Sequence, residues 1–128
     1  MTGSPGKALL VVQSDIEAAQ EDAFNTWYDD VHIPDVLALD HWFSCRRYRL
    51  AGDPRYFPPA AERPQEVLRY LAVWELDTDD VGEAEHSLAA GLVPLRAAGR
   101  VDMADEMRGR VSGYYLPLGP AQHSSRPG

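Results

Sequence analysis

The spacing of apolar residues alternates between the period of a strand and the period of a helix along this chain. The order of the resulting segments is the strongest constraint on the fold. We expect a strand over 8–13, a helix over 16–31, strands over 42–50 and 66–76, a helix over 79–92, and a strand over 110–116. This order predicts an α+β, ferredoxin-like βαββαβ fold, with a four-stranded antiparallel sheet and two helices on one face.

The expected elements form one domain and leave one face of the sheet open. With 128 residues, of which 45% are hydrophobic, the chain is long enough for a single packed core. We place a ferredoxin-like domain at residues 1–118 and a flexible tail rich in Pro, Ser and Gly at residues 119–128. Because no further elements remain to cover the second sheet face, we expect a homodimer in which two copies pack sheet to sheet.

Charge and composition disfavour several classes of partner. The net charge of −8 and the pI near 4.8 argue against nucleic acid and anionic membrane surfaces. The apolar run at 8–12 is too short for a signal peptide or a membrane span, so we expect a cytoplasmic protein. Cys45, the only cysteine, allows neither an intrachain disulfide nor a Cys-based zinc site. No nucleotide-binding motif is present, and we expect no metal and no cofactor.

The strongest candidate for chemistry lies in the segment WYDDVHIPDVLAL, residues 27–39. Pro34 disfavours the helical conformation at Ile33, so we expect the first helix to end or kink near His32. A histidine titrates near neutral pH and can transfer protons in either direction. We therefore predict that His32 is a general acid or base.

Neighbouring side chains could assist His32, and a structural role competes with the catalytic one. Tyr28 lies one helical turn earlier and would share the face of His32. Asp29 or Asp35 could hold one ring nitrogen and leave the other free. The alternative is that His32 only caps the C-terminus of the helix, where the helix dipole favours a cation.

Aromatic residues form a second group of candidates. An aromatic stripe usually belongs to the core, but tyrosine and tryptophan carry a polar group that needs a partner when buried. One or two of these residues could orient a flat aromatic substrate. The group consists of Phe24, Trp27, Tyr28, Tyr70, Trp74, Tyr114 and Tyr115, and the candidates for substrate binding within it are Phe24, Trp27, Tyr70, Trp74 and Tyr115.

The strand expected over 42–50 has two faces, and which of them looks toward the helices stays open. Trp42, Ser44, Arg46 and Tyr48 share one face, and Phe43, Cys45, Arg47 and Arg49 share the other. An arginine inside a half-buried strand must be paired or must reach solvent. Arg46, with Tyr48 beside it, either binds a substrate carboxylate or phenolate or makes a structural ion pair. Arg47 could make such a pair across the dimer interface.

The segment around His32 is similar to that of a known family. An aromatic helix ending in Tyr-Asp-x-x-His-x-Pro at 28–34, then an apolar turn and the strand FSCRRYRL, resembles the dimeric α+β barrel superfamily. Within this superfamily the segment resembles the EthD-like proteins most. Combined with the element order, the resemblance extends over residues 8–118. One departure is His41, where relatives often carry glycine; it could place a second histidine near one end of the pocket.

The resemblance implies a dimer whose two sheets face each other in a barrel, with a largely apolar pocket between the sheet and the helices of each protomer. His32 matches the motif histidine, Tyr28 and Asp29 match the preceding pair, and Pro34 and Asp35 match the following turn. Related proteins include cofactor-free monooxygenases, polyketide cyclases, decarboxylases, dehydratases, isomerases and haem-active members.

Three functional hypotheses follow. The first is a small cofactor-independent enzyme that acts on a hydrophobic, aromatic or polyketide-like compound by cyclisation, isomerisation, dehydration or decarboxylation, with His32 transferring the proton. The second keeps the pocket but uses oxygen, as in cofactor-free monooxygenases. The third is a non-catalytic protein that binds a small molecule, including a haem-binding version, in which His32 is structural. Fold alone does not decide among them.

Overall fold

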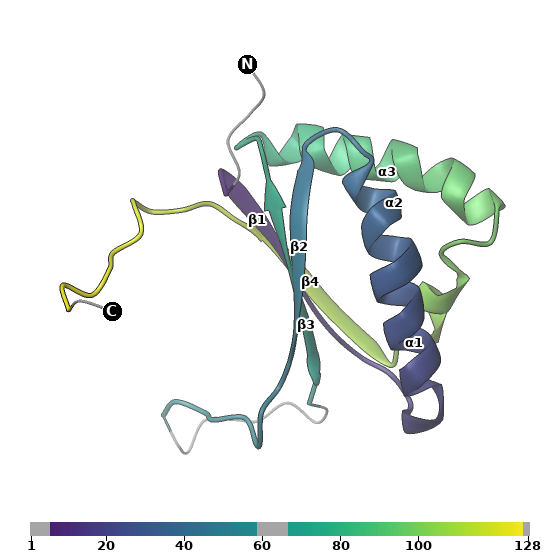
Figure 1. The fold of residues 1–128 in the computed structure, drawn as a ribbon, viewed down its shortest axis with the longest axis horizontal. Helices are drawn as coiled ribbons and strands as arrows, with labels where there is room; N and C mark the ends of the chain where they lie inside the picture. Colours follow the sequence, from purple (N-terminus) through teal and green to yellow (C-terminus); the bar gives the residue numbers. More distant parts are fainter. Residues whose placement is uncertain (1–5, 59–66, 127–128) are drawn as a thin grey trace.

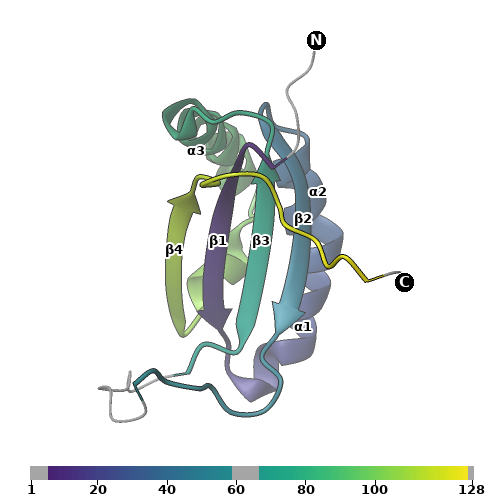
Figure 2. The same cartoon turned by 90° about the vertical axis from the view of Figure 1, so that its left-hand side faces the viewer.

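Four antiparallel strands form one sheet in the order β2–β3–β1–β4 (Figure 2). The computed structural model describes residues 6–58 and 67–126. The strands are β1 (Ala8–Asp15), β2 (Trp42–Arg49), β3 (Tyr70–Leu76) and β4 (Gly109–Tyr115). They start and end within a few residues of the expected positions, except that the third was expected from residue 66, which lies outside the described ranges.

The helical segments all lie on one side of this sheet (Figure 1). They are η1 (Ala18–Gln20), α1 (Glu21–Trp27), the π-helical turn η2 (Tyr28–His32), α2 (Ile33–Leu37), α3 (Val81–Ala97) and the 3₁₀ turn η3 (Asp102–Glu106). The element order and the one-sided helical layer confirm the predicted α+β, ferredoxin-like fold.

Period-two alternation in the two central strands positions the core. Leu10 and Val12 of β1 lie opposite Trp74 and Ala72 of β3, and all four side chains are buried against the helices. The residues between them point to the other side of the sheet. This alternation is what the sequence pattern of the third strand predicted, because successive side chains of a strand leave opposite faces.

Of the two outcomes expected near His32, an end or a kink, the helix does not end there: its geometry becomes irregular at this point and helical structure continues. It passes through the single π-helical turn η2, in which the Ile33 N–H donates to the Tyr28 carbonyl five residues back, and continues as α2 to Leu37. The reason is Pro34, which has no N–H to donate and whose ring would clash with the carbonyl of an ordinary α-helical turn. A widened turn accommodates the proline, and such turns are frequent at functional sites.

The second long helix also runs further than expected. The prediction ended it at Leu92, but α3 continues through Pro94 to Ala97. Gly99 follows with a φ of 76°, the left-handed conformation that ends many helices and that glycine adopts without strain. The helix begins at Asp80, whose carboxylate accepts a hydrogen bond from the Glu83 N–H at 3.0 Å.

A β-bulge in β2 changes which residues face the helices. Trp42 lies opposite Leu76, but Ser44 lies opposite the next residue, Glu75, so Phe43 is an extra residue in the strand. Trp42 therefore faces the helices together with Cys45 and Arg47, rather than with Ser44, Arg46 and Tyr48 as strict alternation predicted.

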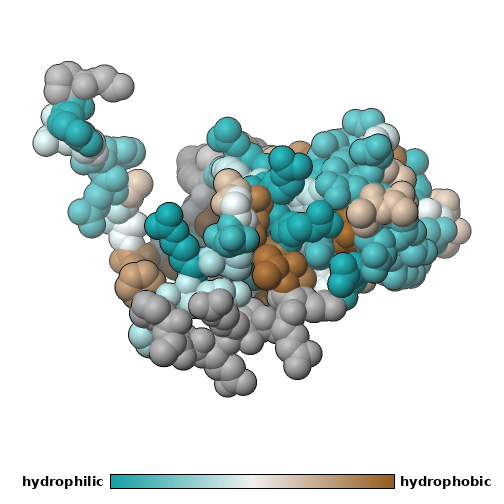
Figure 3. All heavy atoms as spheres, turned by 90° about the horizontal axis from the view of Figure 1, so that it is seen from below, coloured by the Kyte–Doolittle hydropathy of each residue, from teal (hydrophilic) through white to brown (hydrophobic). Residues whose placement is uncertain are grey.

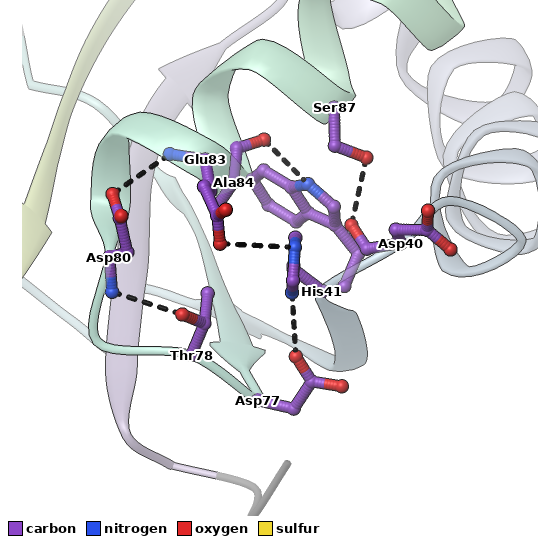
Figure 4. Close-up of polar contacts among 9 residues, drawn as sticks. Asp40, His41, Asp77, Thr78, Asp80, Glu83, Ala84 and Ser87 are labelled. Atoms are coloured by element: carbon purple, nitrogen blue, oxygen red, sulfur yellow. Dashed lines mark hydrogen bonds and ion pairs between the residues drawn. The ribbon is translucent and has the colours of Figure 1, made fainter. Parts of the chain in front are cut away.

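His41 lies outside the pocket region in which the sequence placed it. Its backbone has a φ of 77°, which is unusual for a residue other than glycine and fits the tight turn into β2. The His41 ring lies 3.1 Å from Asp77 and 3.6 Å from Glu83, at the corner where α3 begins (Figure 4). The Trp42 indole donates to the Ala84 carbonyl beside it. These contacts attach the start of α3 to the sheet.

The face of the molecule that is seen from below is mostly hydrophilic (Figure 3). Viewed from below, hydrophobic atoms are confined to small areas among hydrophilic side chains (Figure 3). None of the helices in the described part of the chain has the length and apolarity needed to cross a bilayer.

Candidate functional site

A cavity of about 410 Å³ lies between the helix-covered face of the sheet and the segments α2, α3 and η3. Its size is within the range of small-molecule sites. Apolar side chains make most of its walls, among them Leu10, Val12, Leu88, Leu92, Val101 and Met107. The ionisable and polar side chains that also reach it are Tyr28, His32, Glu85, Arg96, Arg110, Ser112 and Tyr114.

The His32 ring is held in the wall of this cavity by aromatic side chains. It stacks on the Trp27 ring with 4.7 Å between centroids and 17° between planes. The Tyr28 and Trp74 rings meet it edge-on at 5.1 and 5.8 Å. Three aromatic neighbours from one helix and one strand therefore fix the orientation of the imidazole.

No carboxylate holds the imidazole in place. Asp35 is engaged by Arg100 at 2.7 and 3.1 Å, and Asp29 is engaged by Arg47 at 2.8 Å. The Nδ1 atom of His32 is buried and has no hydrogen-bond partner among the described residues. A buried polar atom of this kind calls for an explanation, and a bound ligand is one.

Burial, opposed by the charge of Asp35 and assisted by that of Arg110, lowers the pKa of His32 to about 4. The imidazole is therefore neutral at pH 7. The cap alternative needs a protonated histidine at a helix end, whereas His32 is neutral and lies inside a helical segment that continues to Leu37. The structure thus overturns the cap interpretation.

Tyr28 is buried beside His32 and also lines the cavity. Burial raises the pKa of its phenol well above the usual value, with Cys45 adding to the effect and Arg47 opposing it. Its hydroxyl therefore stays protonated at neutral pH. Within the cavity, Tyr28 can donate a hydrogen bond but cannot serve as a base.

Arg47 anchors the helix that carries Tyr28 and His32. Its guanidinium donates to Asp29 and to the Asn25 amide oxygen, both at 2.8 Å, and lies 4.4 Å from the centroid of the Tyr28 ring. The side chain is only 14% exposed. The expected role of Arg47 in a pair across the dimer interface is therefore wrong, because Arg47 faces its own helix.

Replacing Arg47 by lysine is expected to reduce the free energy of unfolding by about 1–2 kcal/mol, because an ammonium cannot make the two forked hydrogen bonds and the ring contact together. Urea unfolding measures this loss. The control is Arg46→Lys on the opposite face of the same strand, which should cost less than about 0.5 kcal/mol. Equal losses in the two variants would show that the Arg47 contacts contribute little.

Six of the ten predicted site residues lie in the cavity wall, beside it, or in the core next to it. His32, Tyr28 and Trp74 line the cavity. Trp27 supports His32 from the side and donates through its indole N–H to the Arg100 carbonyl at 2.7 Å. Phe24 is fully buried in the core, with Tyr70 packed 5.7 Å from its ring.

Four predicted site residues lie away from the cavity. Arg46 and Tyr48 occupy the uncovered face of the sheet, where the guanidinium lies 5.6 Å from the tyrosine ring, because the β2 bulge separates them from the face of Trp42. Tyr115 is 58% exposed on the same uncovered face. Asp29 is directed to Arg47 rather than to His32.

Apart from Tyr114, which belongs to the aromatic group, the sequence analysis missed the polar residues that β4 and α3 contribute. Arg110, Ser112 and Tyr114 share the cavity face of β4, since they lie opposite Ser14, Val12 and Leu10 of β1. Their alternation in GRVSGYY was the available signal. The Tyr114 hydroxyl donates to the Glu85 carboxylate, and burial together with this bond raises the pKa of Tyr114.

The metal-binding side chains and the thiol among the described residues form no second candidate site. No group of three His, Cys, Asp or Glu side chains within 6–58 and 67–126 is arranged to hold a metal ion. Burial raises the pKa of the Cys45 thiol to about 12, so the thiolate needed of a nucleophile is scarce at neutral pH.

Comparison with known proteins adds little to the geometry. No protein-family model matches the sequence, and a search of curated proteins finds no match. Among solved structures, the chain is similar to a dimeric ferredoxin-like protein of unknown function from Thermobifida fusca YX. The two are 12% identical, the match covers 86% of this chain and 90% of the other, and the TM-score is 0.49.

Proposed function

We propose that this protein is a cofactor-independent enzyme that transfers a proton to or from a flat, hydrophobic small molecule, with His32 as the acid–base group. The observation that carries the proposal is the buried, unpartnered Nδ1 atom of a neutral His32 in the wall of a mostly apolar cavity. Cyclisation, isomerisation, dehydration and decarboxylation all need such a proton transfer.

The aromatic surroundings of His32 support a flat substrate. Trp74 and Tyr28 present ring surfaces to the cavity, and Trp42 lines it as well. Aromatic rings stack on or meet other rings edge-on at low cost, so a planar ligand can lie among them. Tyr28 keeps its proton and can donate a hydrogen bond to a ligand oxygen.

A low pKa is compatible with a base when the reaction creates a charge next to it. Transfer of a substrate proton to His32 produces an imidazolium and a substrate anion side by side. Burial alone disfavours the imidazolium, but a neighbouring anion favours it, so the basicity of His32 rises as the substrate loses its proton.

The same pKa favours one alternative function. A histidine that is neutral at pH 7 can simply donate or accept a hydrogen bond to a ligand that is held without reaction. The protein would then be a non-catalytic small-molecule-binding protein that uses the same cavity. Proton exchange at a bound ligand separates the two functions.

Exchange of acidic C–H protons for deuterium tests the enzyme proposal without knowledge of the full reaction. Aryl ketones and aryl 1,3-diketones are incubated with the protein in D₂O and followed by proton NMR. The wild type is expected to accelerate exchange of at least one compound, and His32→Gln should reduce that acceleration by about 100-fold or more.

A matched control is His41→Gln, which removes a histidine outside the cavity and should leave the exchange rate unchanged. Compounds that bind in the cavity but exchange no faster than in buffer would favour the binding protein. Full exchange activity in His32→Gln would remove His32 from the mechanism.

We also propose that the protein acts as a homodimer through the uncovered sheet face. Leu9, Val11, Leu71 and Val73 are only partly covered there, and Tyr115 is 58% exposed. Residues that follow β4 leave the sheet on the same side (Figure 1), and Leu118 among them is fully exposed. A contiguous apolar sheet face of this kind is typical of an interface.

The EthD-like relationship belongs to the same proposal. It is supported by the Tyr-Asp-x-x-His-x-Pro motif at 28–34 and by the position of its histidine in the cavity wall.

A further inference from the structure

Arg110 differs from the other arginines near the helical layer in having no carboxylate partner. Arg96 pairs with Asp105 at 3.6 Å, and Arg100 pairs with Asp35 at 2.7 Å. Within the described residues, no ion pair or hydrogen bond involves the Arg110 guanidinium; the residue is exposed to solvent and also lines the cavity.

The position of Arg110 in the sheet places it at the cavity that His32 and Tyr28 also line. It lies opposite Ser14 on the cavity face of β4, two residues before Ser112. Its positive charge acts on both of the buried titratable groups of the cavity, lowering the pKa of Tyr28 and of His32. A cation that disfavours a charged imidazole has the opposite effect on an anion bound beside that imidazole.

We propose that Arg110 binds an anionic oxygen of the ligand, so that the ligand is an aromatic or similarly flat compound carrying a carboxylate, a phenolate or an enolate. This inference rests on the proposed ligand site at His32, but it does not require that the ligand be turned over. A guanidinium suits such an oxygen because its planar donors can make two parallel hydrogen bonds.

The remaining charges give the bound ligand one orientation. Glu85 would repel an anion, but it accepts a hydrogen bond from Tyr114, four residues along β4 from Arg110. Four residues of a strand span about 13 Å, so the carboxylate and the guanidinium belong to opposite ends of the cavity. The anionic group is therefore expected near the start of β4 and the uncharged rings near Trp74.

A pair of fluorescent probes with the same aromatic skeleton tests the inference. 8-Anilino-1-naphthalenesulfonate carries one negative charge, and N-phenyl-1-naphthylamine carries none. Both are titrated into the full-length wild type and into Arg110→Gln. The substitution is expected to weaken binding of the anionic probe by about 10-fold and to change binding of the neutral probe by less than about 2-fold.

Arg46→Gln is the matched control, because it removes the same charge from the uncovered face of the sheet. It should leave the affinity of both probes unchanged. An equal loss in Arg46→Gln and Arg110→Gln, or an equal loss of both probes in Arg110→Gln, would overturn the anion-binding role. Failure of both probes to bind the wild type would overturn the ligand site itself, whereas binding without any proton exchange would overturn only the catalytic proposal.

Discussion

Acidification from pH 7 to pH 4 is expected to lower the free energy of unfolding of the wild type by up to about 3 kcal/mol more than that of His32→Gln. The folded-state pKa of His32 is about 4, whereas an unperturbed histidine titrates near 6.5. Between these values the unfolded chain binds a proton that the folded protein does not. Stability is therefore retained above pH 6.5 and is lost progressively as the pH falls toward 4.

Urea unfolding at a series of pH values measures this difference. All other ionisable groups are the same in both proteins, so their contributions cancel in the comparison. The informative quantity is the slope of stability against pH, because glutamine at position 32 changes the absolute stability at every pH. Parallel slopes between pH 6.5 and 4 would mean that His32 is solvated in the folded protein.

Val73→Glu is expected to convert the proposed homodimer into a monomer at micromolar concentration. Val73 lies at the middle of the uncovered sheet face, opposite Val11 of the neighbouring strand. A sheet-to-sheet dimer would bury the new carboxylate without a partner in each copy. An uncompensated buried charge costs about 3–5 kcal/mol, which corresponds to a loss of dimer affinity of about 100-fold or more.

Sedimentation velocity measures the effect, with Val93→Glu as the control. Val93 is 69% exposed on α3, so the same substitution there should leave a dimer intact. A wild type that sediments as a monomer, or a Val73→Glu variant that remains dimeric, would contradict assembly through this sheet face.

The element order and the core could be predicted because they depend on patterns that stay the same when a strand begins or ends a few residues earlier or later. The alternation through Leu10, Val12, Ala72 and Trp74 marks the covered face wherever the strand ends lie. The resemblance to the dimeric α+β barrel superfamily implied a pocket near His32, and Tyr28, which lies four residues earlier, contacts the imidazole in the cavity wall.

The parts of the site that could not be predicted depend on single-residue shifts of backbone geometry. One extra residue at Phe43 decides that Arg47, and not Arg46, reaches the helices. The register of β4 likewise determines which of two adjacent tyrosines reaches the cavity: Tyr114 faces it and Tyr115 faces away. The pattern of apolar residues along the sequence contains no signal for the bulge. It shows which residues of an edge strand face the core only when the neighbouring strand and its register are known.

The ion pairs that engage the carboxylates near His32 could not be predicted either. Asp29 and Asp35 were the expected carboxylate partners of His32, but Arg47 and Arg100 engage them. Arg100 lies 65 residues from Asp35, so no local pattern indicates the pairing. Burial makes His32 neutral at pH 7, and with both carboxylates engaged elsewhere its Nδ1 atom has no hydrogen-bond partner among the described residues.

The central claim, that His32 is the neutral, ligand-contacting histidine of the cavity, is tested most directly by long-range ¹H–¹⁵N NMR of the histidine rings. At pH 7 the account predicts a neutral His32 imidazole whose nitrogen resonances shift on addition of 8-anilino-1-naphthalenesulfonate, whereas those of His41 and His86 stay in place. A protonated His32 at pH 7, or a probe that binds without shifting the His32 resonances, would contradict it.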